Sequence, residues 1–369
     1  MSRYFLAKIG GTKGEDVMSK IYAIDLFCGA GGLTHGLIQA GIGVIAGIDL
    51  DPDCRWAYEH NNKAKYINSD ICDVTGQDLM RLWPEQGIRL LAGCAPCQPF
   101  SSYRKGKIES ADGKWKLLGE FGRLVKESSP DLITMENVPR LQKHKIFLDF
   151  VKDLKKGGYK VWYGVVDCQQ YGVPQKRQRL VLLASKISDV VLIPPTHSED
   201  NYVTVKDAIS HLPEIDSGQA DEKDPLHVAQ GMSHLNLERI RQSKPGGTWK
   251  DWDPELVAAC HKKSSGKTYT SVYGRMRWDE PAPTMTTLCF GFGNGRFGHP
   301  QQDRAISLRE AAIFQSFPEN YVFSEPGAKI TFATVGRLIG NAVPVKLGEV
   351  VGKSFINSLS GGSRRNGGA

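Results

Sequence analysis

Two cysteines stand close together in the segment GCAPCQPFS, residues 93–101, directly after an apolar run. A C-x-x-C pair can be half of a zinc site, a thiol–disulfide switch, or one structural cysteine beside one nucleophile. A structural zinc ion needs about four ligands, and the sequence has no second C-x-x-C, since Cys260-His261 is one isolated pair. The pattern therefore predicts no metal site. It leaves a redox pair or a nucleophile at Cys97 as the open alternatives.

A glycine-rich turn follows the first apolar run, IYAIDLF, and precedes a helical pattern. Glycines at such a turn let a ligand approach the backbone closely. The second and third runs end in GIDLD and NSDICD, and an acidic group at these points suits the hydroxyls of a ribose. The turn is not G-x-G-x-x-G, and no P-loop lysine follows it, which favours S-adenosylmethionine over a dinucleotide or a nucleoside triphosphate. The candidate cofactor residues from this pattern are Gly29, Gly31, Gly32, Asp49 and Asp70.

Segments along nearly the whole chain, from about residue 21 to 355, resemble in order the motifs of the DNA (cytosine-5) methyltransferase family. They are DLFCGAGG (25–32), GCAPCQPFS (93–101), MENVPR (135–140), YGVPQKRQR (171–179), RWDEPAPTMTT (277–287) and IGNAVPV (339–345). The sequence departs from the family at Cys94-Ala95, where Gly-Pro is common, but Pro96-Cys97-Gln98 is intact.

The resemblance implies a catalytic set. Carbon 5 of cytosine is too weak a nucleophile to attack a methyl donor unaided, whereas a thiolate added at carbon 6 makes it enamine-like. Cysteine suits this role because it is nucleophilic even when only a few per cent is thiolate near pH 7. The resemblance gives the thiolate to Cys97 and the contact with ring N3 and the exocyclic amine to Glu136. Arg179 would hold cytosine O2, and Arg177 would support the loop or a phosphate.

The resemblance also extends the cofactor site. Phe27 would pack on the adenine, Asp49 would bind the ribose, and Asp70 would bind the adenine amine. The family often has Glu at the position of Asp49, so the shorter side chain shifts that contact. The remaining residues expected around the cofactor are Leu50, Ile71, Leu117, Asn341 and Ala342.

Duplex DNA hides carbon 6 from a thiolate, so the target base must be flipped out of the stack. The segment SSYRKGKIESADGK, residues 101–114, is expected to be a mobile loop that closes over DNA and grips phosphates. A solvated basic loop is the alternative. Arginine pairs bidentately with guanine, so arginines further along the chain are candidate base readers. The expected DNA-binding residues are Gln98, Ser101, Arg104, Lys105, Lys107, Arg275, Arg277 and Arg296.

The elements that must hold these residues alternate along residues 20–185. Apolar runs predict strands at 21–27, 43–50, 88–95, 131–137 and 179–185. Helical patterns lie between them, at 33–41, 53–62, 117–128 and 146–158. This alternation is typical of a parallel, doubly wound α/β sheet. The resemblance implies the Rossmann-like sheet of S-adenosylmethionine-dependent methyltransferases.

The alternation of strand and helix patterns ends near residue 186, and a smaller, irregular target-recognition domain is expected there. The boundaries expected are an N-terminal extension at 1–19, a catalytic and cofactor-binding domain at 20–185, the target-recognition domain at 186–312, a hinge at 313–329, a return to the catalytic domain at 330–358 and a flexible tail at 359–369.

The whole composition is that of a basic, water-soluble chain of 369 residues with net charge +7 and eight scattered cysteines. The cysteines suggest reduced thiols inside a cell, in the cytoplasm or nucleoid if the source is prokaryotic. No apolar run is long enough to span a bilayer. The expected partner is double-stranded DNA, bound by a monomer, with a cognate restriction endonuclease possible. The alternatives are a tRNA cytosine-C5 methyltransferase and a non-catalytic regulator that binds adenosylmethionine or DNA.

Overall fold

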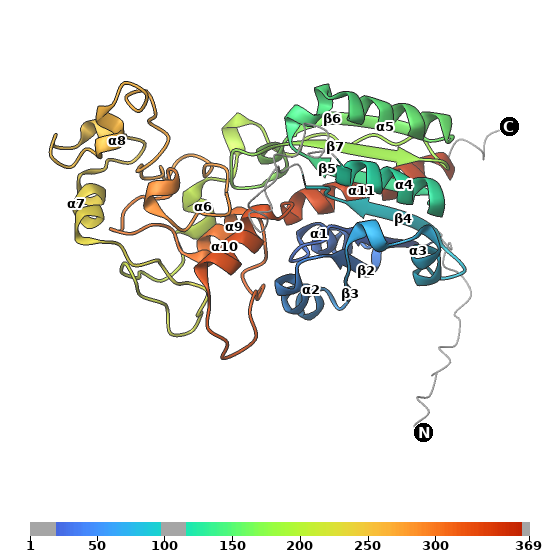
Figure 1. Cartoon of the computed structure of the whole chain (residues 1–369), viewed down its shortest axis with the longest axis horizontal. Helices are drawn as coiled ribbons and strands as arrows, with labels where there is room; N and C mark the ends of the chain where they lie inside the picture. The colour runs from blue at the N-terminus through green and yellow to red at the C-terminus, as the bar shows by residue number, and fades with distance from the viewer. Residues whose placement is uncertain (1–19, 97–115, 364–369) are drawn as a thin grey trace.

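The computed structural model describes residues 20–96 and 116–363. Figure 1 shows two lobes, one built on a single β-sheet and a smaller one of short helices and loops. The sheet has the strand order β3-β2-β1-β4-β5-β7-β6. Its strands are β1 (Ile21–Leu26), β2 (Gly43–Asp49), β3 (Lys65–Asn68), β4 (Ile88–Gly93), β5 (Leu132–Asn137), β6 (Lys160–Asp167) and β7 (Gln178–Ser185).

Helices cover both faces of the sheet. Because successive strand residues point to opposite faces, Ala23 of β1 lies in the core with α1 and α11, and Ile24 lies in the core with α3, α4 and α5. The helices of this lobe are α1 (Gly32–Gln39), α2 (Arg55–Asn62), α3 (Gly76–Leu82), α4 (Lys116–Ser128), α5 (Lys145–Lys156) and α11 (Val345–Ser363). The expected Rossmann-like α/β class is thus confirmed.

The sequence led us to expect a wholly parallel sheet, but the observed sheet is mixed. Strands β1 to β5 are parallel, but β7 runs antiparallel to both β5 and β6. A parallel neighbour needs a crossover of roughly a dozen residues or more, usually helical. The connection from β6 to β7, residues 168–177, is short and contains only a 3-10 turn. The chain therefore turns back on itself, and β7 enters the sheet reversed.

The smaller lobe contains short helices joined by long loops, in keeping with the expected irregular build. Its own apolar cluster includes Ile240, Trp249, Trp252 and Phe292. Its helices are α6 (Val205–Ile209), α7 (His234–Gln242), α8 (Ala259–Lys262), α9 (Leu308–Phe314) and α10 (Phe332–Asn341). None of the described helices of either lobe is long and apolar enough to cross a membrane.

Two expected boundaries differ from the structure. The segment 313–329, expected as a hinge, is packed into the core, since Phe317 and Tyr321 are buried there. The Tyr321 hydroxyl donates to the Ala30 carbonyl in the first lobe. The tail expected from residue 359 begins inside α11, which continues to Ser363. The extension 1–19 and residues 364–369 lie outside the described residues.

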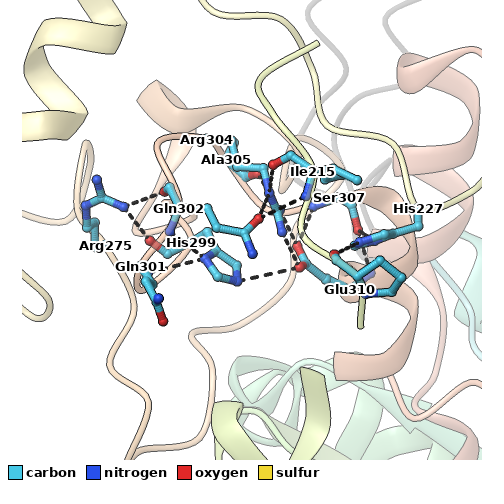
Figure 2. Close-up of polar contacts among 11 residues, drawn as sticks. Ile215, His227, Arg275, His299, Gln301, Gln302, Arg304, Ala305, Ser307 and Glu310 are labelled. Atoms are coloured by element: carbon cyan, nitrogen blue, oxygen red, sulfur yellow. Dashed lines mark hydrogen bonds and ion pairs between the residues drawn. The ribbon is translucent and has the colours of Figure 1, made fainter. Parts of the chain in front are cut away.

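A buried ion pair anchors α9 to the loops of the smaller lobe (Figure 2). Nη1 and Nη2 of Arg304 lie 2.8 and 2.7 Å from the two carboxylate oxygens of Glu310, and both side chains are almost wholly buried. Burial raises the pKa of Glu310, but Arg304 outweighs that effect, so the pKa is held well below its usual range. Arg304 also donates to the Ile215 carbonyl, so the pair joins loops distant in sequence.

His299 borders this ion pair, and its hydrogen bonds fix its protonation. Its Nδ1 accepts from the backbone N–H groups of Gln301 and Gln302, so that nitrogen carries no proton. Nε2 must therefore carry the proton of the neutral ring, and it lies 3.8 Å from Oε1 of Glu310. Burial is the main cause that lowers the pKa of His299, to about 4. The ring is neutral at pH 7.

Candidate active site

The predicted site residues gather at one edge of the sheet. Strands β1 to β5 are parallel, so their carboxyl ends share that edge. The strand order reverses at β1, which has β2 on one side and β4 on the other. Ligands of open α/β sheets bind in the crevice at such a switch point. The glycine turn, Asp49, Asp70 and Glu136 all lie at strand ends along this edge.

The turn after β1 has an unusual backbone. Phe27 has a φ of 58°, and Gly29 and Gly31 have φ of 52° and 92°. A positive φ is a rare conformation for an aromatic residue, and strain of this kind concentrates at functional sites. A Cβ at Gly29 would meet no atom within 4 Å, so the turn borders open space. The backbone is therefore accessible to a ligand at this point.

Asp49 connects the turn to the end of β2. Its Oδ2 accepts from the Gly29 N–H at 2.9 Å, and its Oδ1 accepts from the Asp51 N–H at 2.9 Å. Burial raises the pKa of Asp49. The next residue, Leu50, is 64% exposed, an unusual state for a large apolar side chain at a strand end. A carboxylate and an exposed leucine at this position suit a nucleoside.

The other expected cofactor residues lie around the same crevice or beneath it. Asp70 begins the turn after β3 and accepts from the Cys72 N–H. Ile71 is buried in the core under α4, so it supports that turn from below. Leu117 is half-buried in the first turn of α4, Asn341 is exposed at the end of α10, and Ala342 is buried. A Cβ at Gly32 would clash with the Val343 carbonyl oxygen, so the first and last motifs are packed closely together.

The expected catalytic carboxylate, Glu136, is buried at the end of β5 and paired. Its Oε1 lies 2.6 Å from Nε of Arg179, and its Oε2 lies 2.7 Å from Sγ of Cys94. The next residue, Asn137, donates to the Ala95 carbonyl at 2.8 Å. Glu136 and Asn137 thus hold the chain just before the expected nucleophile. Cys97 itself lies outside the described residues, as do Gln98, Ser101, Arg104, Lys105 and Lys107.

Arg177 lies two positions before Arg179 in sequence, but its side chain is buried away from Glu136's partners at the strand ends. It is 3% exposed and donates to the backbone carbonyls of Met285, Gly340 and Ala342. Its inclusion in the catalytic set is thus corrected, because its contacts are those of a residue that supports loops. The reason is burial, which removes the guanidinium from any bound base.

Two glutamines that the sequence did not single out complete this junction. Gln175 donates to the Phe314 carbonyl and to Oε1 of Gln315, and its own Oε1 accepts from the Met285 N–H. Gln315 donates to the carbonyls of Ile339 and Ala342. Gln175 belongs to the YGVPQKRQR motif, which was a usable signal. Gln315 ends an ordinary apolar helix, and no pattern in the sequence distinguishes it.

The sequence profile of the C-5 cytosine-specific DNA methylase family matches residues 21–357. The chain belongs to this family. The resemblance is therefore confirmed, and so is the activity, that of a DNA (cytosine-5)-methyltransferase.

The chain is similar to type II methylases over nearly its whole length. Type II methylase M.HgiDII of Herpetosiphon aurantiacus is 54% identical over 342 residues, covering 92% of this chain and 96% of that protein. Type II methyltransferase M.Eco47II of Escherichia coli is 30% identical over 366 residues, covering 96% and 84%. Among solved structures, Dnmt2 methyltransferase of S. pombe is 18% identical with a TM-score of 0.58, covering 93% of this chain and 99% of that one. This last likeness supports the fold.

The three arginines expected to read bases in the methylase occupy different environments. Arg275 is buried, and its guanidinium is bonded to the carbonyls of Ile240 and His299 and to Asp303. The structure contradicts base reading by Arg275, because its donors already have partners inside the lobe. Arg296 is half-buried and donates to the Gly246 carbonyl. Arg277 is 51% exposed beside Glu280 and is the most accessible of the three.

Proposed function

We propose that the chain is the modification enzyme of a type II restriction–modification system, and that it methylates one cytosine in a specific duplex DNA sequence. The observation that carries this proposal is the pair Glu136–Arg179, which lies beside the strand end that leads to Cys97. The 54% identity to M.HgiDII, a type II methylase, supports the link to such a system. We propose action as a monomer in a bacterial cytoplasm, with a cognate restriction endonuclease as functional partner.

We propose that the residues at the strand ends around the glycine turn bind S-adenosylmethionine, which would supply an electrophilic methyl group. Gly29 borders open space, and Asp49 and Asp70 stand at neighbouring strand ends, as a nucleoside with ribose hydroxyls and an amine requires. Asp49 would accept from the ribose and Asp70 from the adenine amine. Phe27, Leu50 and Leu117 are the apolar side chains proposed to enclose the adenine. Asn341 and Ala342, beside the glycine turn, would close the other end.

The chain's own residues then act on the base. The Cys97 thiolate adds to carbon 6 of a flipped cytosine, and the electron pair displaced from the double bond makes carbon 5 nucleophilic. Negative charge develops on the ring, and Glu136, which carries a proton at this step, donates a hydrogen bond to N3 and stabilises that charge while Arg179 holds O2. Once carbon 5 carries the methyl group, its proton passes to a base and the thiolate leaves. The ring becomes aromatic again.

A fluorinated substrate tests this mechanism. Fluorine at carbon 5 cannot leave as a cation, so duplex DNA with 5-fluorocytosine at the target accepts the methyl group and stays bonded to the enzyme. We expect an adduct that requires adenosylmethionine, survives denaturation and maps to the peptide containing Cys97, with Cys97→Ser abolishing it. An adduct on tRNA but not on duplex DNA would overturn the proposal that duplex DNA is the substrate. No adduct on either would overturn the mechanism.

A further inference from the structure

Cys94 is the residue at which the nucleophile motif departs from the family, and the mechanism above does not use it. It directly follows β4, and its N–H donates to the Leu26 carbonyl in the neighbouring strand. Strands β4 and β5 are parallel neighbours with Gly93 opposite Met135, so the next residue of each, Cys94 and Glu136, lie side by side. The Cys94 thiol meets Oε2 of Glu136.

The carboxylate of Glu136 is thus held at both oxygens, by Arg179 at Oε1 and by Cys94 at Oε2. A glutamate side chain turns about three bonds, and one partner alone leaves the carboxylate plane free to rotate. Two partners from different strands fix the plane. A carboxylate oxygen accepts more than one hydrogen bond, so Oε2 keeps capacity for the exocyclic amine of a cytosine. Glycine, common in the family at this position, cannot supply such a contact.

We propose that Cys94 is a positioning residue, whose thiol donates to Glu136 and sets its carboxylate for the incoming base. This inference rests on the proposed role of Glu136. Correct orientation before binding lowers the barrier of the chemical step, because less freedom is lost on the way to the transition state. The thiol is a weak donor, so its contribution is smaller than that of Glu136 itself. Loss of the Cys94 thiol should therefore lower kcat more than it weakens DNA affinity.

Cys94 also borders an apolar cluster, so its role could be hydrogen bonding or packing. Single substitutions at Cys94 distinguish the two roles. We expect Cys94→Ala to lower kcat of methyl transfer roughly tenfold, the size of one hydrogen bond to a charged group. The Kd for DNA should stay nearly constant. Cys94→Ser places a hydroxyl donor at the same point and should restore most of kcat. A serine variant as slow as the alanine variant, or an alanine variant with wild-type kcat, would overturn the proposal.

A double-mutant cycle shows whether Cys94 acts through Glu136. Glu136→Gln alone should slow methyl transfer by roughly 10²–10⁴-fold, the usual range for losing a general acid. In that background, Cys94→Ala should cost little more, because its partner is already changed. If the double variant loses rate by the product of the two single losses, Cys94 does not act through Glu136, and the positioning role is wrong. The role of Glu136 in the mechanism would be unaffected by that result. Wild-type turnover in Glu136→Gln would instead overturn the proposed mechanism, and this single variant identifies that failure. Circular dichroism of each variant checks that it is folded.

Discussion

Arg177 and Arg179 lie two positions apart at the start of β7, but they bind different partners. Arg179 pairs with the Glu136 carboxylate at the crevice, whereas Arg177 bonds backbone carbonyls of the segments at 285 and 340–342. Burial, and then the neighbouring Arg179, lowers the pKa of Arg177 to about 10, so it stays charged at neutral pH. A buried cation requires such partners. We infer that Arg177 fixes the loops around the cofactor site.

Arg177→Lys tests this role. An ammonium is a point donor and cannot reach three separate carbonyls in the way a planar guanidinium does. We expect a loss of about 3 kcal/mol of stability, because buried carbonyls lose charged donors, and weaker adenosylmethionine binding. Thermal unfolding and calorimetry measure both. Lys176→Gln, at an adjacent exposed ion pair with Glu280, is the matched control and should change little. Equal behaviour of the two variants would contradict the inference.

At the level of single residues, sequence motifs predicted the side chains that gather at the strand ends better than those that bind only other parts of the protein. Glu136 and Arg179 were expected as partners in one site, and the structure brings them together. Arg275 had the residue type of a base reader, but type does not report burial, and its donors are used inside the lobe. Gln315 acts through contacts across the chain that no local pattern records. Cys97 lies outside the described residues, so its role stays a prediction.

At the level of elements, apolar runs located the buried strands but not their direction. The run 179–185 is apolar whichever way it enters the sheet, and only the short connection from β6 decides that. Among the strands and α-helices of residues 20–185, β6 and α3 were not predicted, whereas the end of β3 was expected at Asp70. Strand β6 is an edge strand whose residues are mostly half-buried, although it contains the apolar run VWYGVV at 161–166. That run closely follows the helical pattern at 146–158, and it was not separated from it.

His299 gives the smaller lobe a pH dependence that can be measured. The folded state holds the ring neutral, with a pKa lowered to about 4 from 6.5, mainly by burial. The unfolded state therefore takes up the proton first as pH falls, so stability is fully present above about 6.5 and is lost as the pH falls towards 4. The loss by pH 4.5 is about 2–3 kcal/mol from this group.

We expect His299→Asn to be less stable at pH 7.5 but to lose less of its stability on acidification. The asparagine side chain has no proton to gain, so the difference in Tm from the wild type should shrink between pH 7.5 and 4.5. Calorimetric scans at each pH measure it. His234→Asn, at a histidine 83% exposed on α7, is the control and should run parallel to the wild type. If the Tm of His299→Asn also follows that of the wild type in parallel from pH 7.5 to 4.5, His299 is not the source of this pH dependence.

At the level of the whole molecule, the end of the chain ties the two lobes together. Arg337 of α10 forms ion pairs with Asp51 and Asp53, in the loop after β2. Helix α11 then packs so closely on α1 that a Cβ at Gly36 would clash with the Val345 carbonyl oxygen. Deleting residues from 330 onward would therefore remove part of the core as well as the IGNAVPV segment. Point variants at Asn341 are the proper test of cofactor closure.

The part of the smaller lobe farthest from these ties is the best candidate for reading DNA sequence. Residues 229–274 contain α7, α8 and most of the lobe's separate apolar cluster. They exclude the Arg304–Glu310 pair and the segment 277–287, whose Met285 contacts Arg177. The wider expected segment, 186–312, would place a junction inside α9 (Leu308–Phe314) and cut that helix.

We therefore predict that exchanging residues 229–274 for those of a relative with a different target changes the methylated sequence and leaves the chemistry intact. The proposed catalytic pair Glu136–Arg179 and the paired glutamines Gln175 and Gln315 stay native, so the hybrid should still form the 5-fluorocytosine adduct. Bisulfite sequencing of DNA from cells that express the hybrid gives the new site directly. A folded hybrid that still methylates the original sequence would show that recognition lies outside 229–274. Arg277 and Arg296, both retained in the hybrid, would then be the next residues to substitute, because each remains at least partly accessible.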